Sequence, residues 1–258
     1  MSIVNHSDMK PKAVTTGSQN EMEQFISTVP MTSPCQRHPD ISQQRDDRRS
    51  WLHRAPKYQR CRVCADEENK ALEIARLQKM GVPAILLEAT LENWGKRSEQ
   101  HQVHRDKVAE FIRVKRGFLI MLGELGTGKS HLAVACLRHF KHGWFVKQSE
   151  LLRHQRNTYN DKCAFDPVEK AQNAGCLVLD EMGLSSGGKD EFMLLHDILD
   201  HRYGNQKPTI LTGNLAYETL TTIIGERMAD RLQEAHFAVL SFGGESHRNK
   251  VHNKYFKT

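Results

Sequence analysis

The stretch GELGTGKS, from Gly123 to Ser130, decides the fold of this 258-residue chain. It follows the apolar run FLIML (118–122) and opens into HLAVACLR (131–138), which predicts a strand, a glycine-rich loop and a helix in that order. This is the context that a phosphate-binding P-loop needs. The glycines let backbone N–H groups turn toward phosphate oxygens, and the N-terminus of the helix adds a positive field. The sequence therefore predicts a site for a nucleoside triphosphate.

The side chains of this loop have separate expected roles. Lys129 is expected to reach the β- and γ-phosphates, and the hydroxyl of Ser130 is expected to hold Mg²⁺. The other contacts with the nucleotide are predicted from Gly123, Gly126, Thr127, Gly128 and His131.

Two further apolar runs end in polar residues. CLVL (176–179) leads into Asp180 and Glu181, and PTILTG (208–213) leads into Asn214. Continuous apolar character is typical of parallel strands buried on both faces, and ligands bind at the carboxyl ends of such strands. We expect Asp180 to share Mg²⁺ with Ser130 and Glu181 to polarise the attacking water. Asn214 could orient that water or touch the γ-phosphate. For Asn214 alone the signal is weak, because asparagine is also common in turns.

Apolar runs near 118–122, 144–148, 176–180, 208–213 and 237–242 alternate with helical patterns. This alternation predicts an α/β fold with a five-stranded parallel sheet. Downstream, Arg227 and Arg231 lie four residues apart in GERMADRL (225–232) and so share one helix face. Spacing alone leaves two interpretations open: an arginine that stabilises a transferring phosphoryl group, or a solvated basic stripe paired with Glu226 and Asp230.

GERMADRL, followed by FAVLSF (237–242) and GESHR (244–248), resembles the end of DnaC-like helicase loaders. These are AAA+ ATPases related to DnaA and to the IstB transposition helpers. MGVP (80–83) and ATLENW (89–94) also resemble the segment that leads into the ATPase core of loaders, so the resemblance covers roughly residues 80–250. It implies an AAA+ P-loop ATPase whose five strands have the order 5-1-4-3-2.

The resemblance also implies roles for single residues. Arg231 matches the arginine finger with Arg227 beside it, Arg248 matches the second sensor arginine, and Asn214 matches the first sensor. The segment 149–159 matches a helical insertion that helps to line a path for single-stranded DNA in that family. Basic side chains would follow phosphates and an aromatic ring would stack on a base. The predicted DNA contacts are Lys147, Arg153, Arg156 and Tyr159; for each, a solvated helix face or a core position is the alternative.

Near the amino terminus, four soft or borderline metal ligands occur in two short pairs: Cys35 with His38, and Cys61 with Cys64. This pattern predicts tetrahedral zinc. The segment between the pairs is polar and arginine-rich, so the metal would supply folding energy that a core cannot. Disulfides fit three thiols badly, and a C-x-x-C redox site, the other alternative, lacks the usual strand and helix surroundings.

The predicted organisation is a mostly disordered segment with a short helix (1–30), a zinc-binding module (31–66), a linker helix and lead-in (67–95) and the AAA+ ATPase domain (96–258). We see no signal peptide and no membrane-spanning run, so a cytoplasmic location is expected. The formal charge of +6 permits binding to nucleic acid without establishing it.

Beyond the nucleotide and zinc sites that these patterns predict, the resemblance implies an ATP-dependent loader that binds a replicative hexameric helicase of the DnaB type and single-stranded DNA during DNA replication. The expected cofactors are ATP, Mg²⁺ and Zn²⁺, and the resemblance implies a homo-oligomer in the ATP state. Two alternatives stay open: an IstB-type ATPase that helps a transposase, and a nucleotide-gated adaptor with little hydrolysis. The zinc-type amino terminus argues against the first alternative, and the presence of Glu181 and Arg231 argues against the second.

Overall fold

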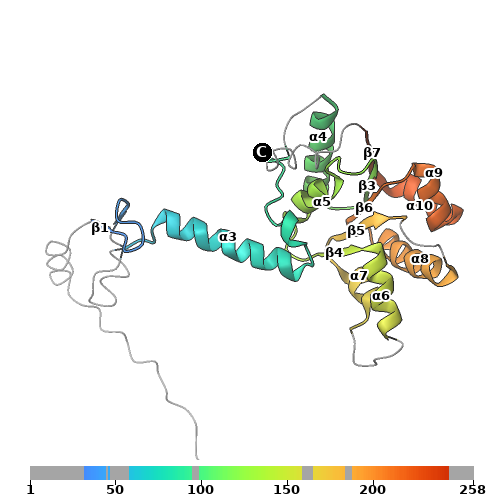
Figure 1. Cartoon of the computed structure of the whole chain (residues 1–258), viewed down its shortest axis with the longest axis horizontal. Helices are drawn as coiled ribbons and strands as arrows, with labels where there is room; N and C mark the ends of the chain where they lie inside the picture. The colour runs from blue at the N-terminus through green and yellow to red at the C-terminus, as the bar shows by residue number, and fades with distance from the viewer. Residues whose placement is uncertain are drawn as a thin grey trace, which may run out of the picture. The chain divides into compact units, whose positions relative to one another are not determined.

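The computed structural model describes residues 32–44, 46, 58–94, 99–158, 165–183 and 188–243 (Figure 1). The chain divides into two compact units, Met1–Leu72 and Glu73–Thr258. The short helix predicted near residues 21–26, Tyr159 and Arg248 lie outside the described residues. Within the described part, no helix has both the length and the apolar character needed to cross a membrane.

The described part of the first unit has very little apolar interior. Strands β1 (Thr32–Pro34) and β2 (Ser42–Gln44) form an antiparallel pair, and helix α3 (Arg62–Lys79) begins in this unit. Among the described residues of the unit, the buried hydrophobic side chains are those of Cys35, Cys61 and Cys64, with Ile41 and Val63 packed partly against them. So small an interior calls for a second source of stability, such as a bound metal.

The second unit is built on the parallel sheet. Its described strands are β3 (Phe118–Gly123), β4 (Trp144–Lys147), β5 (Leu177–Met182), β6 (Thr209–Gly213) and β7 (His236–Phe242). They lie in the order β4-β5-β6-β3-β7, and each neighbouring pair is parallel. Counted along the sequence and read from β7, this order is 5-1-4-3-2. The predicted α/β fold, its five-stranded parallel sheet and its strand order are confirmed.

Helices cover both faces of this sheet, as Figure 1 shows. One face packs on α4 (Glu99–Val114) and α5 (Lys129–Leu137), and the other packs on α8 (Lys189–Gly204), α9 (Tyr217–Ile224) and α10 (Glu226–Ala235). Between β4 and β5 the chain forms α6 (Gln148–Thr158) and α7 (Pro167–Asn173). Because side chains alternate along a strand, β3 supplies both cores: Leu119 and Met121 to one, Phe118, Ile120 and Leu122 to the other.

Residues 73–94, which precede the parallel sheet in the sequence, pack into the core of the second unit. The end of α3, the 3₁₀ turn η1 (Ala84–Leu86) and the chain up to Trp94 contribute side chains to the core beside α5. Arg76 of α3 donates a hydrogen bond of 2.7 Å to the carbonyl of Arg138, and Arg138 pairs with Glu73 at 2.7 Å. Residues 73–94 therefore belong to the same compact unit as the parallel sheet.

One buried cation ties three elements of this unit together. The side chain of Arg202, on α8, is fully buried, and burial lowers its pKa to about 10. Its guanidinium donates hydrogen bonds of 2.7–2.8 Å to the carbonyls of Ala171 and Ala174, at the end of α7, and to that of Pro208. It also donates to Oγ1 of Thr209 at 2.8 Å. These neutral acceptors replace the water that the charge loses on burial.

Candidate nucleotide site and metal centre

The P-loop is held by glycines in conformations that other residues avoid. Gly123, Gly126 and Gly128 have φ angles of 127°, 77° and 93°. A Cβ atom on Gly123 would lie 1.9 Å from the carbonyl oxygen of Phe242, on β7. The loop therefore combines positive φ angles with close backbone packing, which only glycine permits.

Lys129 begins α5 and turns back into the loop. Its Nζ lies 2.8 Å from the carbonyl oxygen of Gly123 and 3.3 Å from Oγ1 of Thr127, and it also contacts the carbonyl oxygen of Glu124. The residue is only 8% exposed. The ammonium group is thus held at the mouth of the P-loop, where phosphate oxygens would be stronger acceptors than these carbonyls.

The P-loop meets the acidic strand through one carboxylate oxygen. Oγ of Ser130 donates a hydrogen bond of 2.8 Å to Oδ1 of Asp180, and Oγ1 of Thr212 donates to the same oxygen. The hydroxyl and the carboxylate are the hard oxygen ligands that Mg²⁺ prefers. Sequence reasoning missed Thr212, although its place near the end of β6, beside β5, was a usable signal.

Most of the predicted nucleotide residues surround one cavity of about 220 Å³. Gly123 does not line it, and Arg248 lies outside the described residues. Leu86 and Leu125 add apolar walls that sequence reasoning did not predict. The lining consists of Leu86, Leu125, Gly126, Thr127, Gly128, Lys129, Ser130, His131, Asp180, Glu181, Thr212, Gly213 and Asn214.

His131 connects this cavity to the lead-in segment. Its Nε2 lies 3.0 Å from the carbonyl oxygen of Thr90 and 2.8 Å from Oδ1 of Asn93. Burial lowers the pKa of His131, which favours the neutral ring. Nε1 of Trp94 donates a hydrogen bond of 3.3 Å to the carbonyl of Gly128. The lead-in thus braces the P-loop, a role that the sequence did not reveal.

Glu181 has a constrained backbone and a cationic partner. Its φ angle is 57°, and the register between β5 and β6 shifts between Leu179 and Met182. The Oε1 atom of Glu181 lies 3.0 Å from Nζ of Lys147, at the end of β4. Lys147, predicted as a DNA contact, is therefore placed beside the predicted catalytic acid, and the ion pair holds the carboxylate that would polarise water.

The two arginines of α10 do not line the nucleotide cavity. Arg231 pairs with Asp200 of α8, and its guanidinium carbon lies 5.5 Å from the centre of the Tyr203 ring. Arg227 is exposed and borders a separate cavity beside Phe192. Neither arginine of α10 therefore reaches the nucleotide cavity of its own chain.

Two of the remaining predicted DNA contacts are on α6. Arg153 and Arg156 are exposed, and Arg156 borders a groove that also includes Lys189 and Asp190 of α8. The structure thus leaves two of the four predicted DNA contacts open to solvent on one helix. It places the third, Lys147, beside Glu181, and the fourth, Tyr159, lies outside the described residues.

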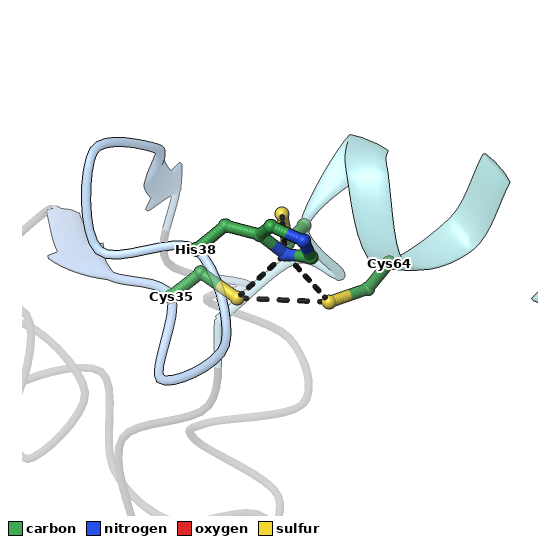
Figure 2. Close-up of side chains that lie close together, drawn as sticks. Cys35, His38 and Cys64 are labelled. Carbon is green, nitrogen blue, oxygen red and sulfur yellow. Dashed lines mark hydrogen bonds between the residues drawn. The ribbon is translucent and has the colours of Figure 1, made fainter. Parts of the chain in front are cut away.

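The four predicted zinc ligands lie together in the first unit. Figure 2 shows Cys35, His38 and Cys64 turned toward one another. The sulfurs of Cys35 and Cys64 are 3.7 Å apart, and Nδ1 of His38 lies 3.9, 3.8 and 3.3 Å from the sulfurs of Cys35, Cys61 and Cys64. A tetrahedron with ordinary zinc–sulfur and zinc–nitrogen lengths has edges of about 3.6–3.8 Å. The donor set therefore fits a zinc ion.

The thiols of this cluster differ in acidity. Burial raises the pKa of Cys35, but hydrogen bonds with Arg37 and His38 outweigh burial and lower the pKa to about 6. Burial and the neighbouring thiols of Cys35 and Cys61 raise the pKa of Cys64 to about 11. A cation must therefore displace protons to collect all the sulfurs as thiolates, which is typical of metal binding by cysteine.

A family model described as "IstB-like ATP binding protein" matches residues 63–255 of this chain. The chain belongs to this family. The replicative helicase loader DnaC of Buchnera aphidicola (subspecies Baizongia pistaciae) is 26% identical over 200 residues, covering 73% of this chain and 81% of the relative. DnaC of Escherichia coli is 24% identical over 201 residues, covering 74% and 82%.

A solved structure, "Crystal structure of the DnaC helicase loader", has the same fold. It matches with a TM-score of 0.57 and 22% identity, covering 62% of this chain and 100% of that chain. The second unit is accordingly an IstB/DnaC-like AAA+ domain, as the resemblance predicted, and ATP is the nucleotide of its family.

Proposed function

We propose that this chain is an ATP-dependent loader that delivers a replicative hexameric helicase to single-stranded DNA during DNA replication. The observation that carries the ATP-dependent part is the shared cavity in which Ser130 donates to Asp180. The loader part is supported by relatives that bear the name replicative helicase loader and align over about four-fifths of their length.

The nucleotide chemistry follows from the residues around the cavity. Backbone N–H groups of the P-loop and the ammonium of Lys129 bind the phosphates, while Ser130 and Asp180 hold Mg²⁺. When bound, Mg²⁺ neutralises charge that develops on the phosphate oxygens. Glu181 accepts a proton from the attacking water once its carboxylate has left Lys147, and Asn214 orients that water.

A second copy of the chain completes the site. Arg231, with Arg227 beside it on α10, lies outside the cavity of its own chain and enters the site of the next subunit, where it stabilises charge on the phosphoryl group. Arg231 must leave Asp200 to do so. ATP therefore favours a homo-oligomer, and Arg248 contacts the nucleotide within its own chain.

The remaining parts of the chain have binding roles in this proposal. Cys35, His38, Cys61 and Cys64 hold Zn²⁺, which stabilises the amino-terminal module that grips the helicase. Arg153, Arg156 and Tyr159 contact single-stranded DNA, the arginines through phosphates and the tyrosine through stacking.

Co-purification with the host's replicative helicase, with and without ATP, tests the loader function. If the chain is a loader, we expect it to form a complex with the helicase, and the amount of that complex should depend on ATP. Capture of a transposase in place of the helicase would support an IstB-type helper instead.

Turnover measurements separate a hydrolysing loader from a nucleotide-gated adaptor. Arg231→Ala is expected to lower ATP turnover at subunit concentrations that favour oligomers and to leave ATP affinity unchanged. Arg113→Ala is a control that removes an exposed arginine from another helix, α4, where no role is proposed. A wild-type chain that binds ATP without measurable turnover would favour the adaptor.

A further inference from the structure

The first turns of α3 carry a run of acids, and one of them, Glu67, faces a predicted zinc ligand. Oε1 of Glu67 lies 3.5 Å from Nε2 of His38. Oε2 of the same carboxylate accepts a hydrogen bond of 3.0 Å from Nη2 of Arg37. The carboxylate is thus fixed between an imidazole and a guanidinium, and each of its oxygens has its own partner.

The two nitrogens of the His38 ring face different partners. Nδ1 faces all three sulfurs, at 3.3–3.9 Å, while Nε2 faces the carboxylate of Glu67. A neutral imidazole carries one proton, so a proton on Nε2 leaves the lone pair of Nδ1 free for a metal. This arrangement therefore favours the tautomer of His38 that is protonated at Nε2.

We propose that Glu67 is a positioning residue of the zinc centre: it accepts the Nε2–H of His38 and so presents Nδ1 to the metal. This inference rests on the proposed zinc site. Histidine ligands commonly donate their second N–H to a carboxylate, which fixes the orientation of the ring and raises its basicity. Zinc withdraws electron density from the ring, so the Nε2–H becomes a stronger donor and the contact with Glu67 strengthens when the metal is bound.

Glu67 acts through His38 and is not a fifth ligand. The ligand atoms that lie within 4.8 Å of one another belong to Cys35, His38, Cys61 and Cys64, and the set does not include Glu67. Arg37 balances the charge of Glu67 and limits its rotation, which lowers the entropy cost of holding the carboxylate in place.

The chain offers a matched control next to Glu67. Glu68 is on the same helix, its side chain is 46% exposed against 47% for Glu67, and it pairs with Arg60. Arg60 is not a zinc ligand. Removal of either acid deletes one carboxylate and one arginine contact from the same turn, but only removal of Glu67 deletes the partner of His38.

The experiment measures the zinc affinity of the full chain by competition with a chromophoric chelator. Glu67→Ala is expected to weaken zinc binding by about tenfold, the lower end of the usual range for such outer partners, because the carboxylate is half-exposed. Glu68→Ala is expected to stay within about twofold of wild type, because surface ion pairs are weak. Glu67→Gln keeps an acceptor oxygen and is expected to fall between the two.

A spectroscopic readout separates positioning from general stability. Long-range ¹H–¹⁵N spectra of the zinc-loaded chain should show His38 with a metal-bound Nδ1 and a protonated Nε2, with the signal assigned by its loss in His38→Gln. In Glu67→Ala the Nε2 proton should exchange faster with water, whereas in Glu68→Ala it should exchange as in wild type.

Equal zinc affinities for Glu67→Ala and Glu68→Ala, or zinc bound to Nε2, would overturn the role of Glu67 while leaving the zinc centre in place. A wild-type chain that binds no zinc would overturn both. ATP affinity is expected to be the same in all of these variants, since the changes lie in the other unit.

Discussion

The two units of this chain hold their ligand-binding residues in opposite ways. In the AAA+ domain, buried strands and helices on both faces of the sheet fix the P-loop, Asp180 and Thr212. In the first unit, the buried hydrophobic side chains among the described residues are three cysteines, which are themselves the predicted ligands. A hydrophobic core therefore positions the residues of the nucleotide site. In the first unit, the predicted zinc ligands themselves form most of the described interior.

This difference sets what each ligand does for the protein. The hydrogen bond between Ser130 and Asp180 shows that the fold of the second unit itself brings these two predicted Mg²⁺ ligands together. The four predicted zinc ligands come from the hairpin of β1 and β2 and from the start of α3. Glu67 of α3 also pairs with Arg37 and lies beside His38, but such exposed ion pairs contribute little stability. Zinc binding should therefore be folding energy for the first unit, while ATP binding should mainly change what the second unit contacts.

Removal of zinc should have the largest effect of the changes considered, and it tests whether the first unit depends on its metal. A chelator that strips the metal is expected to unfold the first unit, because structural zinc contributes on the order of 10 kcal/mol to such modules. The AAA+ domain should keep its structure and its ATP affinity. Limited proteolysis with mass spectrometry checks this: cleavage should spread over residues 32–61 and stay unchanged in the parallel sheet, and added zinc should restore protection. Persistent protection of the metal-free module would show that it has another source of stability.

Arg202→Met tests whether the AAA+ domain depends on its interior. The change removes the buried guanidinium and its hydrogen bonds to the carbonyls of Ala171 and Ala174. The carbonyl of Pro208 also loses this donor but keeps the N–H of Leu177. We expect a loss of about 3–5 kcal/mol in the free energy of unfolding of this domain, measured by urea denaturation.

Arg227→Met is the matched control for this change, because Arg227 is an exposed arginine of the same domain. It should alter the stability by less than about 0.5 kcal/mol. Zinc content should be the same in both variants. A similar small effect for Arg202→Met would contradict the tie between α7, α8 and β6.

Lys147→Ala tests whether the ion pair between Lys147 and Glu181 restrains the predicted catalytic acid. The ion pair between Lys147 and Glu181 is about one-third exposed on each side, so it is worth at most about 1 kcal/mol. Its loss frees the carboxylate, and ATP turnover without DNA is expected to rise by up to about fivefold. Arg153→Ala, on the neighbouring helix, should leave this turnover unchanged.

A fall in turnover for Lys147→Ala would show that the lysine assists Glu181 instead of restraining it. DNA affinity gives a second test of the same residue. If Lys147→Ala weakens binding to single-stranded DNA more than Arg153→Ala does, the predicted DNA contact at Lys147 stands beside its role at Glu181.

The sequence predicted those features that depend on local patterns. The P-loop, the acid-ended strand and the five apolar runs each lie within a few residues, and the strand order came with the family resemblance. The clustering of Cys35, His38, Cys61 and Cys64 was also predicted, because the ligand types and their spacing are typical of zinc sites.

Features that depend on contacts between distant elements were missed. Helical spacing suggested Glu226 and Asp230 as partners for Arg231, yet its partner is Asp200, which approaches from α8. The pairing of Lys147 with Glu181 depends on the register of β4 against β5, where Lys147 lies opposite Asp180. The sequence pattern predicts that these strands are parallel, but it does not predict which residues lie opposite one another.

Calorimetry can measure the binding of ATP to the wild-type chain and to Lys129→Ala, first with Mg²⁺ and then with a magnesium chelator. This measurement tests whether Lys129, Ser130 and Asp180 bind ATP together with Mg²⁺. We predict one ATP per wild-type chain, weaker binding without Mg²⁺, and a loss of about tenfold or more in affinity for the variant, because a charge-assisted hydrogen bond is worth about 1.5–3 kcal/mol. The variant should keep its zinc content. Equal ATP affinity for the two chains, or binding that ignores Mg²⁺, would contradict the claim that Lys129, Ser130 and Asp180 share one triphosphate.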